Sequence, residues 1–62
     1  MKICAYEAIY ALREFVETMS LEPQDMVEFL EKKFNIDLEL DVESNSLTLE
    51  DVMHKFVVNF VG

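Results

Sequence analysis

The only proline, Pro23, divides the first half of the chain into two amphipathic stretches. Proline cannot sit inside a helix, because its ring clashes with the preceding turn and it lacks a backbone N–H, but it fits the first turn of a new helix. It also pushes the residue before it, Glu22, toward an extended conformation. The sequence therefore predicts one helix over about residues 2–19 and a second over residues 23–34.

The predicted first helix carries two apolar strips. The first strip has the three- and four-residue spacing of a core-facing helix and comprises Ala5, Ala8, Leu12, Phe15, Val16 and Met19. The second strip, Ile3, Tyr6 and Tyr10, falls among charged side chains. Because one strip is enough to join a core, we expect the second to bind another protein or to pair first helices in a homodimer.

The middle of the chain, residues 36–43, alternates strictly between apolar and acidic side chains, which is the pattern of a half-buried strand. These residues could form a hairpin with the segment that follows, although Ser44-Asn45 is a weak turn sequence. Thr48 competes with the hairpin, because Thr48 and Asp51 resemble a capping box that starts a helix. We favour the cap.

The predicted fold is therefore mainly α: a small bundle of three principal helices, at about 2–19, 23–34 and 49–61, with an extended segment at 36–42. The alternative is an α+β fold with a short hairpin of residues 36–42 and 46–49. The second and third helices each have one apolar strip, which comprises Met26, Val27, Leu30 and Phe34 in the second, and Leu49, Val52, Met53, Phe56 and Phe60 in the third.

Length and charge limit the classes of function. The 62 residues allow one small domain, residues 1–62, and the 52% apolar content favours a folded chain. A net charge of −8, from 13 acidic and 5 basic side chains, repels nucleic acids and anionic membranes and favours a basic protein partner. No signal peptide is visible and no apolar run approaches the roughly 18 residues of a membrane span, so we expect a cytoplasmic protein.

No group of side chains predicts catalysis or metal binding. His54, the only histidine, falls on the outer side of the last helix without a positioned partner. Cys4, the only cysteine, is expected as a small buried residue on the core side of the first helix. We therefore expect no enzymatic activity and no metal ion, and a cofactor only under one interpretation of Ser20.

That interpretation comes from a resemblance of residues 20–58 to the acyl or peptidyl carrier proteins, which are small acidic helical bundles. The stretch SLEPQDMVEFLEKKFNIDL resembles the family's serine-leucine-acid start and long acidic helix, and LTLEDVMHKFV resembles its final helix. The resemblance implies that Ser20 carries 4'-phosphopantetheine. The family has an aspartate where this chain has Met19, and a long loop before the serine that is missing here. The other interpretation is that Ser20 is a turn or helix-capping residue, which we favour.

The densest acidic feature consists of Asp37, Glu39, Asp41 and Glu43. On a regular strand these side chains would project from one face about 6.6 Å apart. We interpret them as a solvated face, and a mimic of nucleic-acid phosphates is the less favoured alternative.

Together these features predict a small acidic, non-catalytic protein-interaction module with a carrier-like scaffold, which regulates or inhibits a partner protein. Its predicted binding residues are Ile3, Tyr6 and Tyr10. The alternative function is an acyl or peptidyl carrier protein that bears phosphopantetheine on Ser20.

Overall fold

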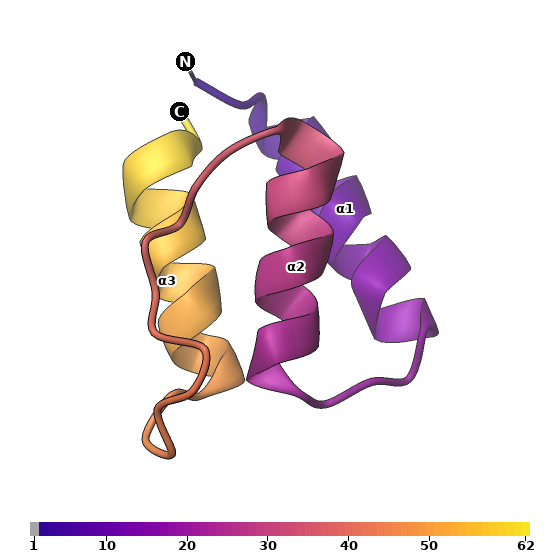
Figure 1. Cartoon of the computed structure of the whole chain (residues 1–62). Helices are drawn as coiled ribbons and strands as arrows, with labels where there is room; N and C mark the ends of the chain where they lie inside the picture. The colour runs from indigo at the N-terminus through magenta and orange to yellow at the C-terminus, as the bar shows by residue number, and fades with distance from the viewer. Residues whose placement is uncertain (1) are drawn as a thin grey trace.

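The computed structural model describes residues 2–62 and shows three helices (Figure 1). Helix α1 spans Ala5–Glu17, α2 spans Pro23–Phe34 and α3 spans Leu49–Phe60. Figure 1 shows that α1 runs antiparallel to α2 and α3, while the long segment between α2 and α3 returns along α3 before that helix begins. The prediction of a mainly α bundle with an extended segment after the second helix is confirmed.

Local signals fix the ends of α2 and α3. Pro23 is the first residue of α2, after an extended Glu22. The helix ends at Phe34 and is followed by Asn35, which adopts the left-handed conformation that asparagine tolerates. At the start of α3 the Thr48 hydroxyl accepts a hydrogen bond from the Asp51 N–H at 3.1 Å. The Asp51 carboxylate in turn accepts one from the Thr48 N–H at 3.1 Å. The predicted capping box is therefore confirmed.

The hairpin alternative is wrong. Residues 36–47 contain no strand in the structure, and the chain turns instead through hydrogen bonds from the Ser44 N–H to the Asp41 carbonyl and from the Leu47 N–H to the Ser44 carbonyl. The cap at Thr48 commits the following residues to a helix, which removes the second strand of the predicted pair.

The two ends of the chain pair with each other. The Ile3 N–H donates to the Phe60 carbonyl at 2.6 Å, and the Gly62 N–H donates to the Ile3 carbonyl at 3.1 Å, which makes a parallel bridge between Ile3 and Val61. Because residues 2–4 are extended in this pairing, α1 begins at Ala5 and not at residue 2. The predicted burial of Cys4 is also wrong, since this side chain is exposed.

The core lies between the three helices and the extended segment. Two aromatic pairs connect the helices: Phe15 of α1 lies 5.6 Å from Phe29 of α2, and Phe34 of α2 lies 5.5 Å from Phe56 of α3, measured between ring centroids. The buried side chains are Ile3, Ala8, Ala11, Phe15, Met26, Val27, Leu30, Leu38, Val52 and Phe56. Leu38 is the contribution of the extended segment, and its side chain is fully buried.

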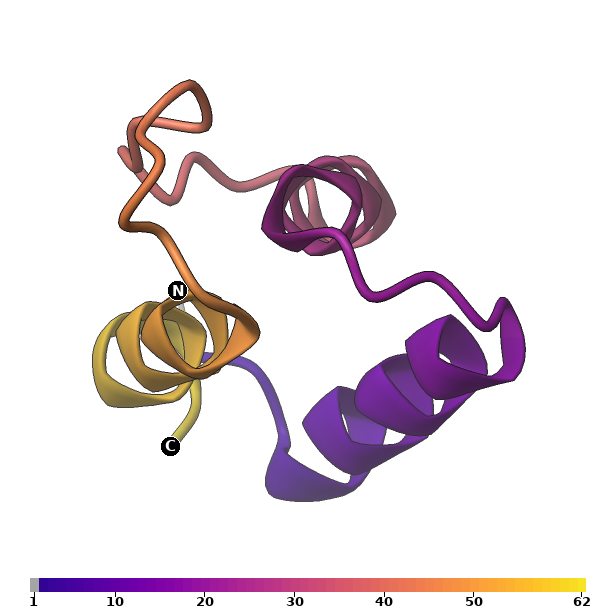
Figure 2. The same ribbon diagram turned by 90° about the horizontal axis from the view of Figure 1, so that it is seen from below.

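The buried face of α1 differs from the predicted strip. Ala11 is buried, whereas Ala5 and Val16, which the sequence places in the core, are exposed. Met19 is also exposed, because α1 ends at Glu17 and not near residue 19 as predicted, and Met19 follows in a turn with a positive φ of 63°. The exposure of Val16 follows from the arrangement of the helices. Helix α2 packs against both α1 and α3, whereas Figure 2 shows α1 and α3 apart from each other. Among the described residues, no Cα atom of α1 lies within 8 Å of a Cα atom of α3. One flank of α1 is therefore left without a helix packed against it.

Candidate protein-binding surface

Three large side chains project from the side of α1 that faces away from the core. Tyr6, Ile9 and Tyr10 are 74%, 60% and 66% exposed, and we call them the α1 surface. Ile3 does not belong to it, because this residue precedes the helix and is only 4% exposed. The prediction that Ile3 shares an exposed strip with the two tyrosines is therefore wrong. Its spacing from them is helical, but its backbone is not.

Ile9 is the residue of this surface that the sequence reasoning missed. It follows Tyr6 by three positions and immediately precedes Tyr10, so a helix beginning at Ala5 presents all three on its outer side. The signal was present in the helical spacing, but Ile9 belongs to neither of the two predicted strips.

A shallow groove of about 390 Å³ lies between α1 and α3. We call it the α1–α3 groove. Four apolar side chains and two polar ones line it: Leu12 of α1 and Glu50, Met53, His54, Val57 and Val58 of α3. The last two valines are 45% and 59% exposed, and Met53 is 37% exposed. Met53 was predicted as a core residue, and it is uncovered because α1 does not pack against this flank of α3.

The groove and the α1 surface adjoin. Ile9 and Val16 lie three positions before and four positions after Leu12, so they share its flank of the helix. Ile9 belongs at the same time to the α1 surface. By these helical positions the exposed apolar side chains continue from Tyr6 through Ile9 to the groove lining on α1 and α3. Figure 2 shows that α1 and α3 form the side of the bundle opposite α2.

Ion pairs are placed away from the groove. The Lys33 ammonium lies 2.7 Å from the Glu14 carboxylate, which links α2 to the other flank of α1, and it also lies over the Phe29 ring. Arg13 pairs with Glu17 along α1 at 3.6 Å, and both side chains are exposed, so this pair adds little stability. None of the five basic side chains is among the residues that line the groove.

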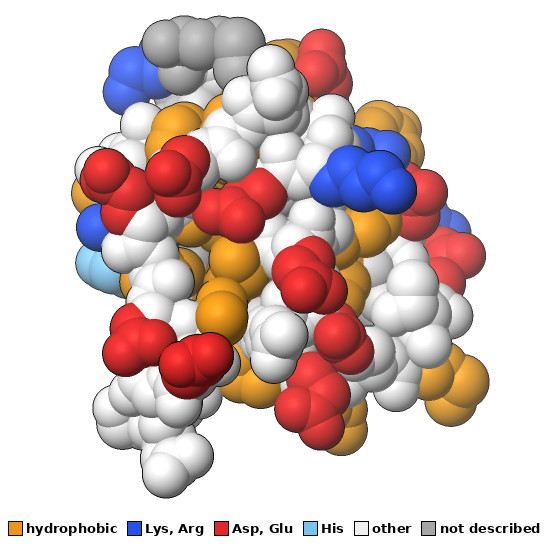
Figure 3. Space-filling view, viewed as in Figure 1, with side chains coloured by type: hydrophobic (Ala, Val, Ile, Leu, Met, Phe, Trp, Pro, Cys, Tyr) orange, Lys and Arg blue, Asp and Glu red, His pale blue; other side chains and the backbone are white. Residues whose placement is uncertain are grey.

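The four acids of the extended segment are all exposed, while the apolar residues between them turn inward. Their backbone is not a regular strand. The Asp37 carboxylate accepts a hydrogen bond from the Glu39 N–H at 2.9 Å, Asp41 does the same for Glu43 at 3.0 Å, and Glu39 has a positive φ of 55°. Aspartate favours such local turns, so these acids do not lie on the regular strand that an even spacing would require. Figure 3 shows acidic side chains spread over the face of the molecule on which the extended segment lies.

Ser20 lies in the loop between α1 and α2. Its hydroxyl donates to the Asp25 carboxylate at 2.6 Å and accepts from the Glu22 N–H at 3.3 Å. The N-cap of α2 is Glu22, without a side-chain hydrogen bond, so Ser20 is a turn residue and not the cap. An ester at the Ser20 oxygen would remove the hydrogen bond that it donates to Asp25. These contacts make Ser20 part of the loop structure.

Other chemistry-bearing residues are dispersed. Cys4 and His54 are both exposed, and residues 2–62 contain no group of three or more His, Cys, Asp or Glu side chains that could hold a metal ion. Across the same residues no helix has the length and apolar character needed to span a membrane.

Comparison with known proteins gives no match: no protein-family model, curated protein or solved structure matches this chain. The resemblance of residues 20–58 to carrier proteins therefore stays a prediction.

Proposed function

We propose that this chain is a small acidic protein-interaction module without catalytic activity. The observation that carries the proposal is the apolar side of the bundle opposite α2, where the α1 surface adjoins the α1–α3 groove. Single exposed apolar side chains are common in folded proteins, but contiguous patches of them mark binding surfaces.

The composition of the α1 surface supports a protein partner. Tyr6 and Tyr10 each offer a large rigid ring to bury and a hydroxyl that tolerates water, which is why tyrosine is frequent at the energetic centres of interfaces. Ile9 between them adds an aliphatic contact. A module of this kind acts by covering part of its partner, and it would regulate or inhibit the partner by occupying that surface.

Affinity capture from the cells that produce the protein tests this proposal. The parent chain is compared with a variant that combines Tyr6→Ser and Tyr10→Ser, and with Leu21→Ser, which removes an 80% exposed apolar side chain from the α1–α2 loop. We expect the parent and Leu21→Ser to enrich the same proteins and the double variant to lose them. Equal enrichment by all three would contradict the proposal, provided that melting curves show the double variant folded.

A further inference from the structure

We propose that the α1–α3 groove binds a basic amphipathic helix of a partner protein. This inference rests on the proposed protein-binding function and names the class of its partner.

The shape of the site fits a helix. Helices in direct contact lie about 8–10 Å apart between axes, whereas α1 and α3 are held apart, each packed against α2. Two antiparallel helices on a common support leave a groove that a further helix can fill, as in a four-helix bundle. Recognition of a helix in a groove uses apolar anchors at i, i+3, i+4 and i+7, and the apolar lining supplied by Leu12, Met53 and Val57 suits such anchors.

The charge of the site selects a basic helix. Glu50 is the acidic residue in the lining, and no lysine or arginine lines the groove. The chain as a whole carries a charge of −8, so it attracts a cationic partner over distances comparable to the Debye length. A second copy would bring the same negative charge, which opposes self-association through this groove. The occupant that both the apolar lining and the charge favour is therefore a helix with one apolar face and lysines or arginines around it.

The test uses designed peptides of about 18 residues, long enough to form several helical turns. The first is an amphipathic leucine–lysine helix. The second has the same composition in a scrambled order without an apolar face, and the third replaces lysine by glutamate. Each is titrated into isotopically labelled protein, and both the dissociation constant and the amide chemical shifts are measured. We expect the leucine–lysine helix alone to shift the amides of Leu12, Met53 and Val57.

Variants of the protein locate the binding. Met53→Ser combined with Val57→Ser is expected to raise the dissociation constant of the leucine–lysine helix roughly tenfold or more, since removal of anchor residues has effects of this size. Glu50→Lys should weaken its binding as well, whereas Leu21→Ser, at an 80% exposed position of the α1–α2 loop outside the groove, should change the dissociation constant less than about twofold. All three variants alter exposed or half-exposed side chains, and melting curves check that they remain folded.

Two kinds of result would overturn the inference: equal binding of the scrambled or the glutamate peptide, or shifts confined to the acidic residues 37–43. Either would leave the proposed function standing if the tyrosine variant still loses the proteins captured from cells. If the tyrosine variant also captures the same proteins as the parent, both the proposed function and this inference are contradicted.

Discussion

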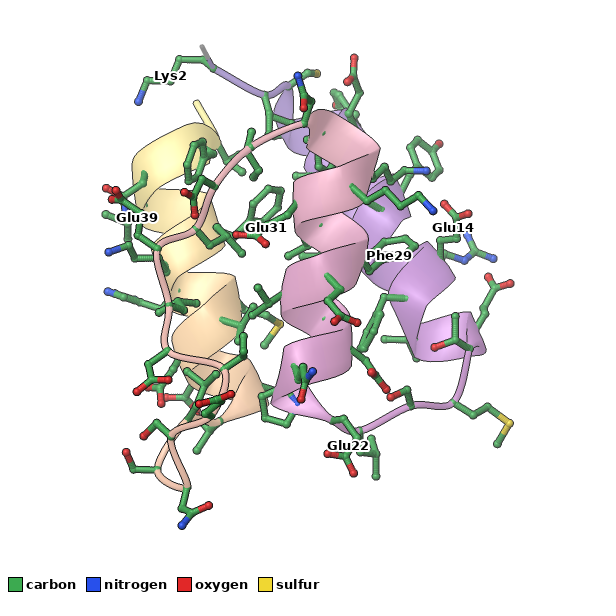
Figure 4. The ribbon with its side chains drawn as sticks, in the orientation of Figure 1. Lys2, Glu14, Glu22, Phe29, Glu31 and Glu39 are labelled. Atoms are coloured by element: carbon green, nitrogen blue, oxygen red, sulfur yellow. The ribbon has the colours of Figure 1, made fainter. Side chains whose placement is uncertain are left out.

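The carboxylate of Glu31 accepts a hydrogen bond from the backbone N–H of Leu38 at 2.8 Å. This contact joins α2 to the extended segment, and Figure 4 shows the Glu31 side chain directed toward that segment. The segment has no strand partner along residues 36–41, so a side chain supplies the acceptor that a neighbouring strand would otherwise provide. It fixes the backbone at the residue whose side chain is fully buried in the core.

Replacing Glu31 by alanine is therefore expected to lower the free energy of unfolding by about 1–3 kcal/mol, because a partly buried N–H loses a charged acceptor. Glu28→Ala is the matched control, since Glu28 is an exposed glutamate of the same helix, and its effect should stay within about 0.5 kcal/mol. Urea unfolding followed by circular dichroism measures both. Equal midpoints for the two variants would show that the contact does not hold the segment.

Phe56 is expected to be the most sensitive residue of α3. Its ring is fully buried and stacks on Phe34, so Phe56→Ala should cost about 3–5 kcal/mol. A domain of this size has about 5 kcal/mol or little more to lose, so the variant should be largely unfolded. Val58→Ala, at a 59% exposed position of the same helix, should melt close to the parent. A Phe56→Ala protein with an unchanged melting temperature would contradict the described core.

The parts of the fold that depend on local sequence could be predicted. Pro23 sets the start of α2 and the pairing of Thr48 with Asp51 sets the start of α3, because each acts through its own turn of the chain. The start of α1 could not be predicted in this way. It depends on the pairing of Ile3 with Val61, a contact between the two ends that no local pattern reports.

The candidate surface was predicted in part for the same reason. Helical spacing indicated that Tyr6 and Tyr10 share a side of the first helix, but it could not say which flank α2 would cover. Met53 and Val16 have the spacing of core residues and are exposed, because α1 and α3 do not pack on each other. The groove is a property of this arrangement and not of either helix alone.

Ser20 is expected to stay unmodified when the chain is expressed with a broad-specificity phosphopantetheinyl transferase. Met19 replaces the aspartate of the carrier motif, and the Ser20 hydroxyl is held by Asp25 and the Glu22 N–H. Intact-mass measurement shows whether phosphopantetheine has been attached, with Ser20→Ala as the control. A mass gain of one phosphopantetheine on most molecules, absent from Ser20→Ala, would favour the carrier alternative.

The protein is expected to be a monomer of 7.3 kDa in dilute solution at low salt, because two copies would bring their negative charges together. Light scattering at several concentrations and salt levels measures the molar mass. A homodimer through the α1 surface predicts instead a mass that rises with concentration and with salt, as repulsion is screened. A dimer that Tyr6→Ser with Tyr10→Ser abolishes would make the partner a second copy.

Site-specific photo-crosslinking in the producing cells tests the protein-binding function most directly. A benzophenone amino acid is placed at Tyr10 on the exposed side of α1, and in a second protein at Asn45, an exposed position of the turn before α3. We expect a discrete crosslinked partner from position 10 and none from position 45. The absence of any product from position 10, or the same products from both positions, would contradict the protein-binding function.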